Sequence, residues 1–577
     1  MPKRGGSVHV ATIKTEGKGG RVYTSHLLRR SFREGGKVRH ENLGNLSHLP
    51  IEVIDGVRAM LAGRALVDLD SGFEICRSLP HGHVAATLGA LRSLDLERLV
   101  CRERCRERDL VVAMVIQRLI APGSKLSATR RFGQTTLADE LSLGEVKEAE
   151  LLAAMDWLLE RQDRIERVLA KRHLAGEGFV LYDLSSSYVE GRACPLATLG
   201  YSRDAKKGKL QVNYGLVCSP QGRPVAVSVH EGRVQDQTTV PATIEAVRGR
   251  FGIENVVFVG DRGMITQAHA EALTEQGVDF ISALKAPQIR KLLEAGDLQL
   301  GLFDERNLAE IASEEFPGER LVVCRNPAVA AERARKRAEL LAATEAELEK
   351  VRAMVEGERG SLRKAAAGRI GERAGRVVNR FKVAKHFELR IDDASFSWQR
   401  KEGQIAAEAA LDGLYVIRTT CPAELIGAAA TVRAYKQLKV AERAFRTMKD
   451  SIEIRPIHHH LETRVRAHIF LCMLSYYVSF ELHARLAPLM FTDEEPLSPA
   501  DPVAPAERSQ AARAKAGSSR TEDGFVAHSL GDLLAELATV CRNEVRIGDR
   551  EHTFARLTTP TELQARAFDR LEVKLHA

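Results

Sequence analysis

The spacing of apolar residues divides the first third of the chain into two regions. Over residues 7–45, β-forming residues alternate with turn sequences such as REGGK, which predicts a small basic β-meander at residues 1–50. Over residues 51–172, apolar residues recur every three or four positions, as in DLVVAMVIQRLIAP. This period predicts a domain of several short helices.

The period changes near residue 178, where strand and helix patterns begin to alternate. The β-runs GFVLYDLSSSYVEG, KLQVNYGLVCS and RPVAVSVHEG are separated by Gly, Pro and Ser, which predicts neighbouring antiparallel strands. A helix, the strand NVVFVGD, a second helix and the strand DFISALK follow. The order β-β-β-α-β-α-β predicts the first part of an α/β sheet domain at residues 173–289.

The alternation stops at residues 290–410, which we expect to form an insertion in the sheet domain. Mostly apolar residues recur there at three- and four-residue steps among dense Arg, Lys and Glu, which predicts a long amphipathic helix. These positions are Ala334, Ala338, Leu341, Thr344, Leu348, Val351 and Val355. A helical hairpin within the chain is favoured over an intermolecular coiled coil. The sheet domain is expected to resume at residues 411–485.

The C-terminal part of the chain changes composition again. Residues 486–524 are rich in Pro, Ala, Ser and charged residues without any period, which predicts a flexible linker. Residues 525–577 are predicted to form a short α+β tail.

Composition limits the kinds of protein that the sequence can encode. The 577 residues carry a formal charge of +8, so an acidic partner such as nucleic acid is compatible with the chain. The start lacks the apolar run of a signal peptide, and the apolar stretch at residues 468–480 is too short to span a bilayer. We therefore expect a cytoplasmic protein with no membrane partner. The nine cysteines include no C-x-x-C pair, which argues against a zinc site.

Two strands of the predicted sheet deliver an aspartate at or near their C-terminal ends. Asp183 follows the run FVLY, and Asp261 follows VVFVG. Sites form at this edge of an open α/β sheet because its loops expose side chains above rigid strands. Taken singly, each aspartate is better explained by a turn or a helix cap.

A third carboxylate, Glu442, belongs to a stripe on a predicted helix. The stripe spans an arc of about 100° and consists of Tyr435, Leu438, Glu442, Phe445, Arg446 and Lys449. A carboxylate that shares a partly buried face with apolar residues needs a positive partner, and a metal ion supplies one. Three carboxylates without a Cys/His cluster favour two Mg²⁺ or Mn²⁺ ions and phosphodiester chemistry.

Six blocks carry a family resemblance: YDLSSSYVEG, GYSRDAKKGKLQVNYGL, HEGRVQDQTT, VVFVGDRGM, DGLYVIRTT and YKQLKVAERAFRTMK. In this order they resemble the ribonuclease-H-like DDE transposases of bacterial insertion sequences, in the branch with a β-rich insertion before the third acid. The Y-x2-R-x3-E-x6-K signature of that branch reads Tyr435, Leu438, Glu442 and Lys449 here.

The resemblance implies a fold, a reaction and partners. The fold is a ribonuclease-H-like mixed sheet with helices, interrupted by an insertion domain and preceded by β and helical DNA-binding regions. Asp183, Asp261 and Glu442 would be the acids that bind the two metal ions. The protein would bind terminal inverted repeats and target DNA, cut and join strands as a homodimer in a synaptic complex, and associate with the nucleoid. The residues expected to contact DNA are Tyr435, Arg446, Lys449, Arg262 and Lys285.

Two positions depart from the family pattern. Leu438 stands where the signature has arginine, and Lys439 is expected to point about 100° away and not to replace it. Arg233 follows Gly232 where the family has Gly-Asn. A catalytically silent DNA-binding relative therefore stays open as the alternative, whereas an aspartyl-phosphate phosphatase is disfavoured because Ser185 stands where a second aspartate is needed.

A histidine-rich segment, RPIHHHLETRVRAH, follows the predicted Glu442 helix. Adjacent histidines on a helix diverge by about 100° and rarely bind one ion together. A structural role or contact with a DNA phosphate is therefore favoured over a metal site.

Overall fold

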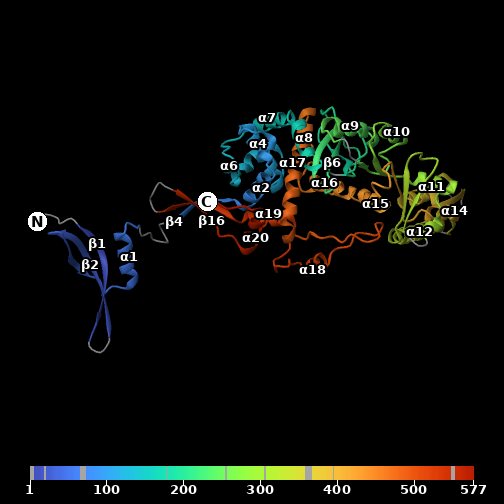
Figure 1. Ribbon diagram of the computed structural model, residues 1–577. Coiled ribbons are helices and arrows are strands. Elements are labelled where there is room, and N and C mark those ends of the chain that lie inside the picture. Colours follow the sequence, from blue (N-terminus) through green and yellow to red (C-terminus); the bar gives the residue numbers. More distant parts are fainter. Residues whose placement is uncertain are drawn as a thin grey trace. The chain divides into compact units, whose positions relative to one another are not determined.

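The chain forms two compact units (Figure 1). The computed structural model describes residues 6–17, 21–64, 73–176, 178–253, 257–303, 307–357, 367–393, 395–547 and 553–576. Unit 1 comprises Met1–Leu79, Val540–Thr559 and His576–Ala577, and unit 2 comprises Pro80–Thr539 and Pro560–Leu575. Both ends of the chain contribute to unit 1, which the predicted boundaries at residues 50 and 525 do not anticipate.

Unit 1 contains the predicted N-terminal meander. Its antiparallel strands are β1 (Ser7–Glu16), β2 (Val22–Glu34) and β3 (Lys37–Asn45). Gly35 and Gly36 turn the chain between β2 and β3 with φ angles of 57° and 76°, a backbone conformation that glycine adopts without strain. Helix α1 (Ile51–Leu61) packs against β1.

A second sheet of unit 1 joins distant parts of the sequence. Its order is β16 (Thr553–Leu557), β15 (Cys541–Ile547) and β4 (Phe73–Pro80). The prediction of helix throughout residues 51–172 is therefore wrong at β4. Because the partner of β4 lies near the opposite end of the chain, no local period marks it as a strand.

Unit 2 begins with a bundle of short helices. They are α2 (Gly82–Ser93), α3 (Leu96–Val100), α4 (Arg106–Ile120), α5 (Lys125–Arg131), α6 (Leu137–Glu140), α7 (Glu148–Leu159) and α8 (Gln162–His173). Helix α17 (Glu462–Leu486) packs against α4 and α7 and is buried around most of its circumference. No single helix in the described ranges is long and apolar enough to cross a membrane, although α4 and Lys125–Gln134, bent by 91°, pass that test as a pair.

An eight-stranded mixed sheet forms the centre of unit 2. Its order is β10 (Leu308–Ile311), β11 (Arg320–Arg325), β14 (Leu414–Thr419), β9 (Phe280–Ala283), β8 (Val257–Gly260), β5 (Phe179–Tyr188), β6 (Gln211–Cys218) and β7 (Pro224–Glu231). Strands β5, β8 and β9 run parallel, and the other neighbours pair antiparallel. The predicted α/β class is confirmed, and the sheet is consistent with a ribonuclease-H-like core.

Helices follow the strands in the predicted order. They are α9 (Val240–Glu245), α10 (Gln267–Glu275), α11 (Ala286–Ala295), α15 (Ala428–Lys436) and α16 (Leu438–Asp450). Helix α16 packs against β5, and α15 packs against β8, β9 and β14. The helix that carries Glu442 therefore packs on the strand of Asp183, and the preceding helix packs on the strand that leads to Asp261.

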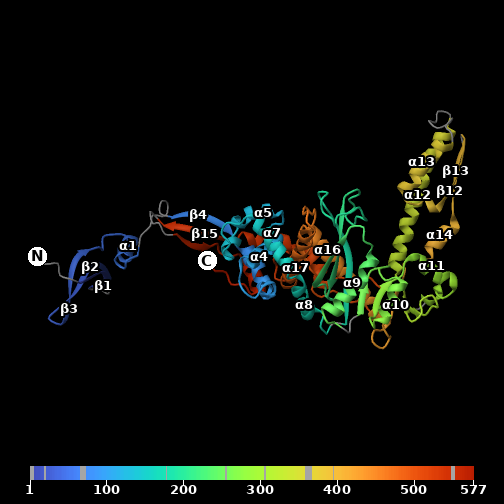
Figure 2. The same cartoon turned by 90° about the horizontal axis from the view of Figure 1, so that it is seen from above.

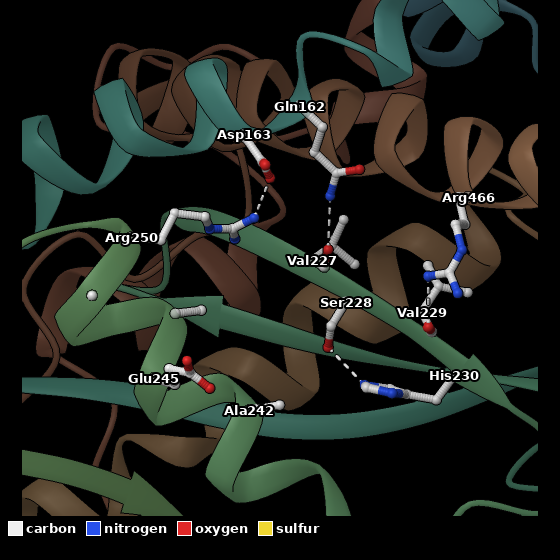
Figure 3. A pocket seen from close by; sticks show the side chains of 12 residues that line it. Gln162, Asp163, Val227, Ser228, Val229, His230, Ala242, Glu245, Arg250 and Arg466 are labelled. Atoms are coloured by element: carbon white, nitrogen blue, oxygen red, sulfur yellow. Dashed lines mark hydrogen bonds and ion pairs between the residues drawn. The ribbon is translucent and has the colours of Figure 1, made fainter.

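Side chains from two helices close the outer edge of β7 (Figure 3). Gln162 of α8 donates to the Val227 carbonyl at 2.9 Å, and Arg466 of α17 donates to the Val229 carbonyl at 2.8 Å. The Val227 N–H donates to the Glu166 carboxylate at 3.0 Å. Because these bonds occupy the free edge, another strand cannot readily add there.

The predicted insertion is divided between the central sheet and a separate core. Strands β10 and β11 belong to the central sheet. The prediction of one inserted domain at residues 290–410 did not anticipate this. The separate core is formed by α12 (Pro327–Glu356), α13 (Ala367–Arg380), β12 (Phe387–Asp392), β13 (Ser395–Arg400) and α14 (Glu402–Ala409). Figure 2 shows α12 and α13 side by side, which confirms a helical hairpin. Leu341, Leu348 and Val351 of the predicted stripe are buried, whereas Ala334 and Ala338 are exposed.

The segment expected to be a flexible linker is tied to the sheet domain instead. It contains helix α18 (Gln510–Ser518), and Val503 is completely buried. Lys436 donates to the carbonyls of residues 502, 503 and 504 at 2.6, 2.9 and 2.9 Å. Composition does not reveal such an anchor because its donor comes from another part of the chain. Beyond it, α19 (Leu530–Ala538) packs against α2, and α20 (Glu562–Leu571) packs against α2 and α17.

Candidate active site

The register of two parallel strands places Asp183 beside Asp261. The pairing of β5 with β8 ends at Tyr182 opposite Gly260, and the aspartates are the next residues, Asp183 within β5 and Asp261 directly after the end of β8. Neighbouring strands lie about 4.8 Å apart, and residues at one level of a parallel pair point to the same face. Asp183 is not at the end of its strand, because β5 continues to Tyr188 against β6. The shared level of the two residues follows from where the parallel pairing ends.

Asp183 experiences the charges of both other acids. Its Oδ1 accepts a hydrogen bond from the Leu184 N–H at 2.7 Å. Burial raises the pKa of Asp183 to about 7, and repulsion from Asp261 and Glu442 adds to that rise, while Arg203 opposes it. The three carboxylates therefore form one negative cluster, which we call the acid cluster.

Glu442 reaches this cluster from α16. The helix buries Leu438, Ala441, Ala444, Phe445 and Met448, and it leaves Glu442 and Arg446 exposed. The predicted stripe is therefore partly buried at Leu438 and Phe445, but its charged members Glu442 and Arg446 are exposed. The predicted single helix is also divided, since α15 ends at Lys436 and α16 begins at Leu438.

A cavity of about 300 Å³ contains Asp261, Glu442 and Tyr435. The Tyr435 hydroxyl lies 3.4 Å from Asp261 Oδ1, to which it donates. Burial and the negative charge of Asp261 raise the pKa of Tyr435, so the phenol keeps the proton with which it orients the carboxylate. Together with Arg262, four of the predicted site residues therefore line one cavity.

Basic side chains also line the cavity. Arg262, Lys439 and Arg333 line it, and Leu438 lies among them. Lys439 was expected to point away, but its long flexible side chain spans the angular offset. Arg333 comes from the exposed first part of α12 and had no signal in the sequence beyond the basic residues around it.

The other predicted DNA-contact residues have different surroundings. Lys449 donates to Asp204 Oδ1 at 2.9 Å, and Arg455 pairs with the same buried carboxylate. Lys449 therefore already has an internal partner. The phosphate contact expected of it stays a prediction. Lys285 lies against Gly263, where an added Cβ would meet Lys285 Cε at 2.0 Å, so this glycine makes room for the lysine beside the Asp261 loop.

Two further arginines, Arg233 and Arg203, belong to segments that the sequence analysis singled out. Arg233, at the family's Asn position, is exposed and pairs with Glu231 at 2.8 Å. Arg203 was missed as an individual residue, although the basic run at 202–209 marks its neighbourhood. It pairs with Asp236 and lowers the pKa of Asp183, which places its charge near the acid cluster.

The acid cluster has the chemistry of a divalent-cation site. Its donors are carboxylate oxygens, which Mg²⁺ and Mn²⁺ prefer. Mutual repulsion and burial raise the pKa of Asp183, and a bound cation would remove that repulsion. Within the described ranges, no three His, Cys, Asp or Glu side chains are already gathered tightly enough to form a ready-made metal site.

Two family models match parts of the chain. Residues 180–478, more than half of the chain, match the transposase DDE domain, and residues 10–68 match the N-terminal domain of IS1634 family transposases. No curated protein matches the chain. The cryo-EM structure of a piggyBac transposase synaptic complex with hairpin DNA aligns over 72% of this chain and 78% of that chain, with 10% sequence identity and a TM-score of 0.32.

Proposed function

The chain belongs to the transposases with a DDE domain, and from that premise we propose that it moves an insertion sequence by metal-dependent DNA cleavage and strand transfer. The observation that carries the proposal is the shared level of Asp183 and Asp261 on parallel strands, with Glu442 close enough to raise the pKa of Asp183. The substrates are the terminal inverted repeats of the element and the target DNA.

The proposed chemistry assigns a task to each group around the cavity. Asp183, Asp261 and Glu442 would hold two Mg²⁺ or Mn²⁺ ions, which activate a water or 3′-hydroxyl and stabilise the leaving oxygen. Tyr435 orients Asp261 through its hydroxyl. Arg262, Lys439 and Arg333 supply positive charge for the phosphates next to the scissile bond. Arg333 and Lys439 provide cations in a cavity where Leu438 replaces the signature arginine.

We further propose that a homodimer holds two element ends in a synaptic complex in the bacterial cytoplasm, associated with the nucleoid. The alternative is a silent relative that binds inverted repeats without cutting them. The three acids favour the enzyme, because a binding protein has no need to keep Asp183 buried where the charges of Asp261 and Glu442 repel it.

A plasmid cleavage assay tests the proposal. The plasmid carries the DNA that flanks this gene, and the cation is Mg²⁺, Mn²⁺, Ca²⁺ or none, with EDTA. We expect cleavage with Mg²⁺ or Mn²⁺ and binding with little cleavage in Ca²⁺, whose larger coordination shell places the attacking oxygen poorly. Cleavage that survives EDTA contradicts the two-metal mechanism. Binding without cleavage in every metal supports the silent relative.

A further inference from the structure

A second cavity, of about 320 Å³, lies where α4 and α5 face the segment between α16 and α17. We call it the cation cavity. Its basic and histidine side chains are Arg118, Lys125, Arg455, Arg464, His458, His459, His460 and His468. Two acids, Glu148 and Glu453, also line it, and both are exposed.

Lys125 is the least compensated charge in this cavity. Only 6% of the residue is exposed, and within the described part of the chain its ammonium has no hydrogen bond or ion pair. Burial lowers the pKa of Lys125 to about 7, and repulsion from Arg118 contributes to that fall. The Lys125 ammonium lines the cavity without a partner among the described residues, and an anion from outside the chain would compensate its charge.

The neighbours of Lys125 do not neutralise it. Arg118 donates to the carbonyls of Ile452 and Glu453 at 3.2 and 3.0 Å, so dipoles rather than a carboxylate satisfy its guanidinium. His468 Nε2 donates to the Ile454 carbonyl at 2.9 Å, and its buried Nδ1 has no partner among the residues that the structure describes. Burial, Arg118 and Lys125 lower the pKa of His468, which keeps that ring neutral.

The two other arginines of the cavity have internal partners. Arg455 pairs with Asp204 and Asp450, and Arg464 pairs with Asp156. The uncompensated charge is therefore concentrated at Arg118 and Lys125. The cavity of about 560 Å³ in Figure 3 differs, because its Arg250 pairs with both Asp163 and Glu166.

We propose that the cation cavity binds a backbone phosphate of the DNA on which the active site acts, an inference that rests on the proposed function. A phosphate is the anion that suits a guanidinium and an ammonium placed side by side. Its oxygens would accept from Lys125, whose charge they compensate.

The wall of the cation cavity is attached to the strand of Asp183. The Ile457 N–H donates to the Tyr188 carbonyl at 3.1 Å, and the Glu190 N–H donates to the Ile457 carbonyl at 2.8 Å. At about 3.3 Å per strand residue, the five steps from Asp183 to Tyr188 span about 17 Å. A DNA strand that rises about 3.4 Å per nucleotide covers this distance in about five nucleotides. These 17 Å end at Tyr188, where the cavity wall is attached, and this attachment supports the proposal that the bound phosphate belongs to the DNA segment that enters the active site.

Replacement of Lys125 by methionine in the full-length protein tests the proposal. The melting temperature is measured with increasing inorganic phosphate, and binding to a fluorescein-labelled duplex of the flanking DNA is measured across a salt series in EDTA. In Lys125→Met we expect an unchanged or higher melting temperature without phosphate and loss of the phosphate-induced rise. We also expect about tenfold weaker DNA binding and a salt dependence reduced by about one counterion. Lys171→Met, at an exposed lysine of α8, is the matched control and is expected to behave as wild type.

The outcomes separate this proposal from the nuclease assignment. Destabilisation of Lys125→Met, or an unchanged response to phosphate, overturns the cation cavity as an anion site. Loss of the phosphate response with unchanged DNA binding assigns the cavity to a small free anion and overturns the DNA proposal. Because binding is measured in EDTA, failure of cleavage in Mg²⁺ defeats the proposed enzyme and leaves this result standing.

A second measurement requires no variant of Lys125. Ethylation of individual backbone phosphates of the same duplex should interfere with binding by wild-type protein at a phosphate about five nucleotides from the cleavage site. Lys171→Met should leave that interference in place, because this exposed lysine of α8 does not line the cavity. An interference pattern without such a phosphate contradicts the proposal.

Discussion

The acid cluster and the cation cavity have opposite charge, but burial affects them in the same way. Burial and like charges raise the pKa of Asp183 in the first and lower the pKa of Lys125 in the second, each to about 7. In both places the protein disfavours the charged form of its own side chain. Each arrangement becomes favourable when a ligand of opposite charge binds, a metal ion in one and a phosphate in the other.

A third buried charge shows what an internally neutralised site looks like. The side chains of Arg418 and Glu319 are each 2% exposed, and Arg418 Nε donates to Glu319 Oε2 at 2.6 Å. Each of the two side chains neutralises the charge of the other, so neither needs an external ligand. Burial alone therefore does not mark a charge that awaits a ligand, and the two proposed sites differ from this pair because like charges lie beside the buried group.

The largest expected effect comes from the acid cluster. Asp183→Asn, Asp261→Asn and Glu442→Gln should each reduce DNA cleavage about a thousandfold or more, since each removes metal-binding charge with little change in volume. Binding to the element ends should be largely retained. Glu275→Gln, at an exposed glutamate of α10, is the control. Wild-type cleavage by any one variant removes that residue from the site, and unfolding of all three favours a structural role.

The internally neutralised pair should respond in stability. Glu319→Gln leaves Arg418 buried without its carboxylate and should lower the free energy of unfolding by about 3–5 kcal/mol, measured by urea denaturation. Glu310→Gln, which breaks the more exposed pair with Arg320, should cost about 1 kcal/mol or less. Equal losses in the two variants contradict the distinction between buried and exposed pairs.

Two cations of α16 separate structural from DNA-binding charge. Lys449→Met removes one partner of buried Asp204 and should lower the free energy of unfolding by about 1–3 kcal/mol with little change in the salt dependence of DNA binding. Exposed Arg446, when replaced by methionine, should flatten that salt dependence by about one counterion and leave stability unchanged. A weaker salt dependence of DNA binding in Lys449→Met would support the phosphate contact that the sequence predicts for this lysine.

The smallest expected effect is a pH-dependent change in stability. The pKa of Asp183 is raised from 3.8 to about 7 in the fold, so its contribution to stability is present below pH 3.8 and is lost as the pH rises through 7. Without metal, Asp183→Asn should therefore melt about 3 °C above wild type at pH 8 and at nearly the same temperature at pH 4. Mg²⁺ at pH 8 should reverse the difference. Parallel melting curves at both pH values contradict the raised pKa.

Local patterns predicted much of the fold because they depend on neighbours in sequence. Hydrophobic period and turn residues predicted the order of strands and helices along the chain around Asp183 and Asp261, and also the α12–α13 hairpin. Local patterns did not reveal β4, whose partner lies near the other end of the chain, or the ordering of residues 486–524. Pairing across long separations leaves no period to detect.

The sequence by itself determined the family, the α/β class and the three acids proposed for the site, because six ordered blocks and the strand pattern are properties of the chain alone. Only the tertiary structure decided which charges are already neutralised. Lys449 has Asp204 as a partner, Arg333 reaches the acid cluster's cavity from α12, and Lys125 is buried beside Arg118. The sequence gives the type of each charged side chain. The energy of its charge depends on the solvent that folding removes and on the partners that folding supplies.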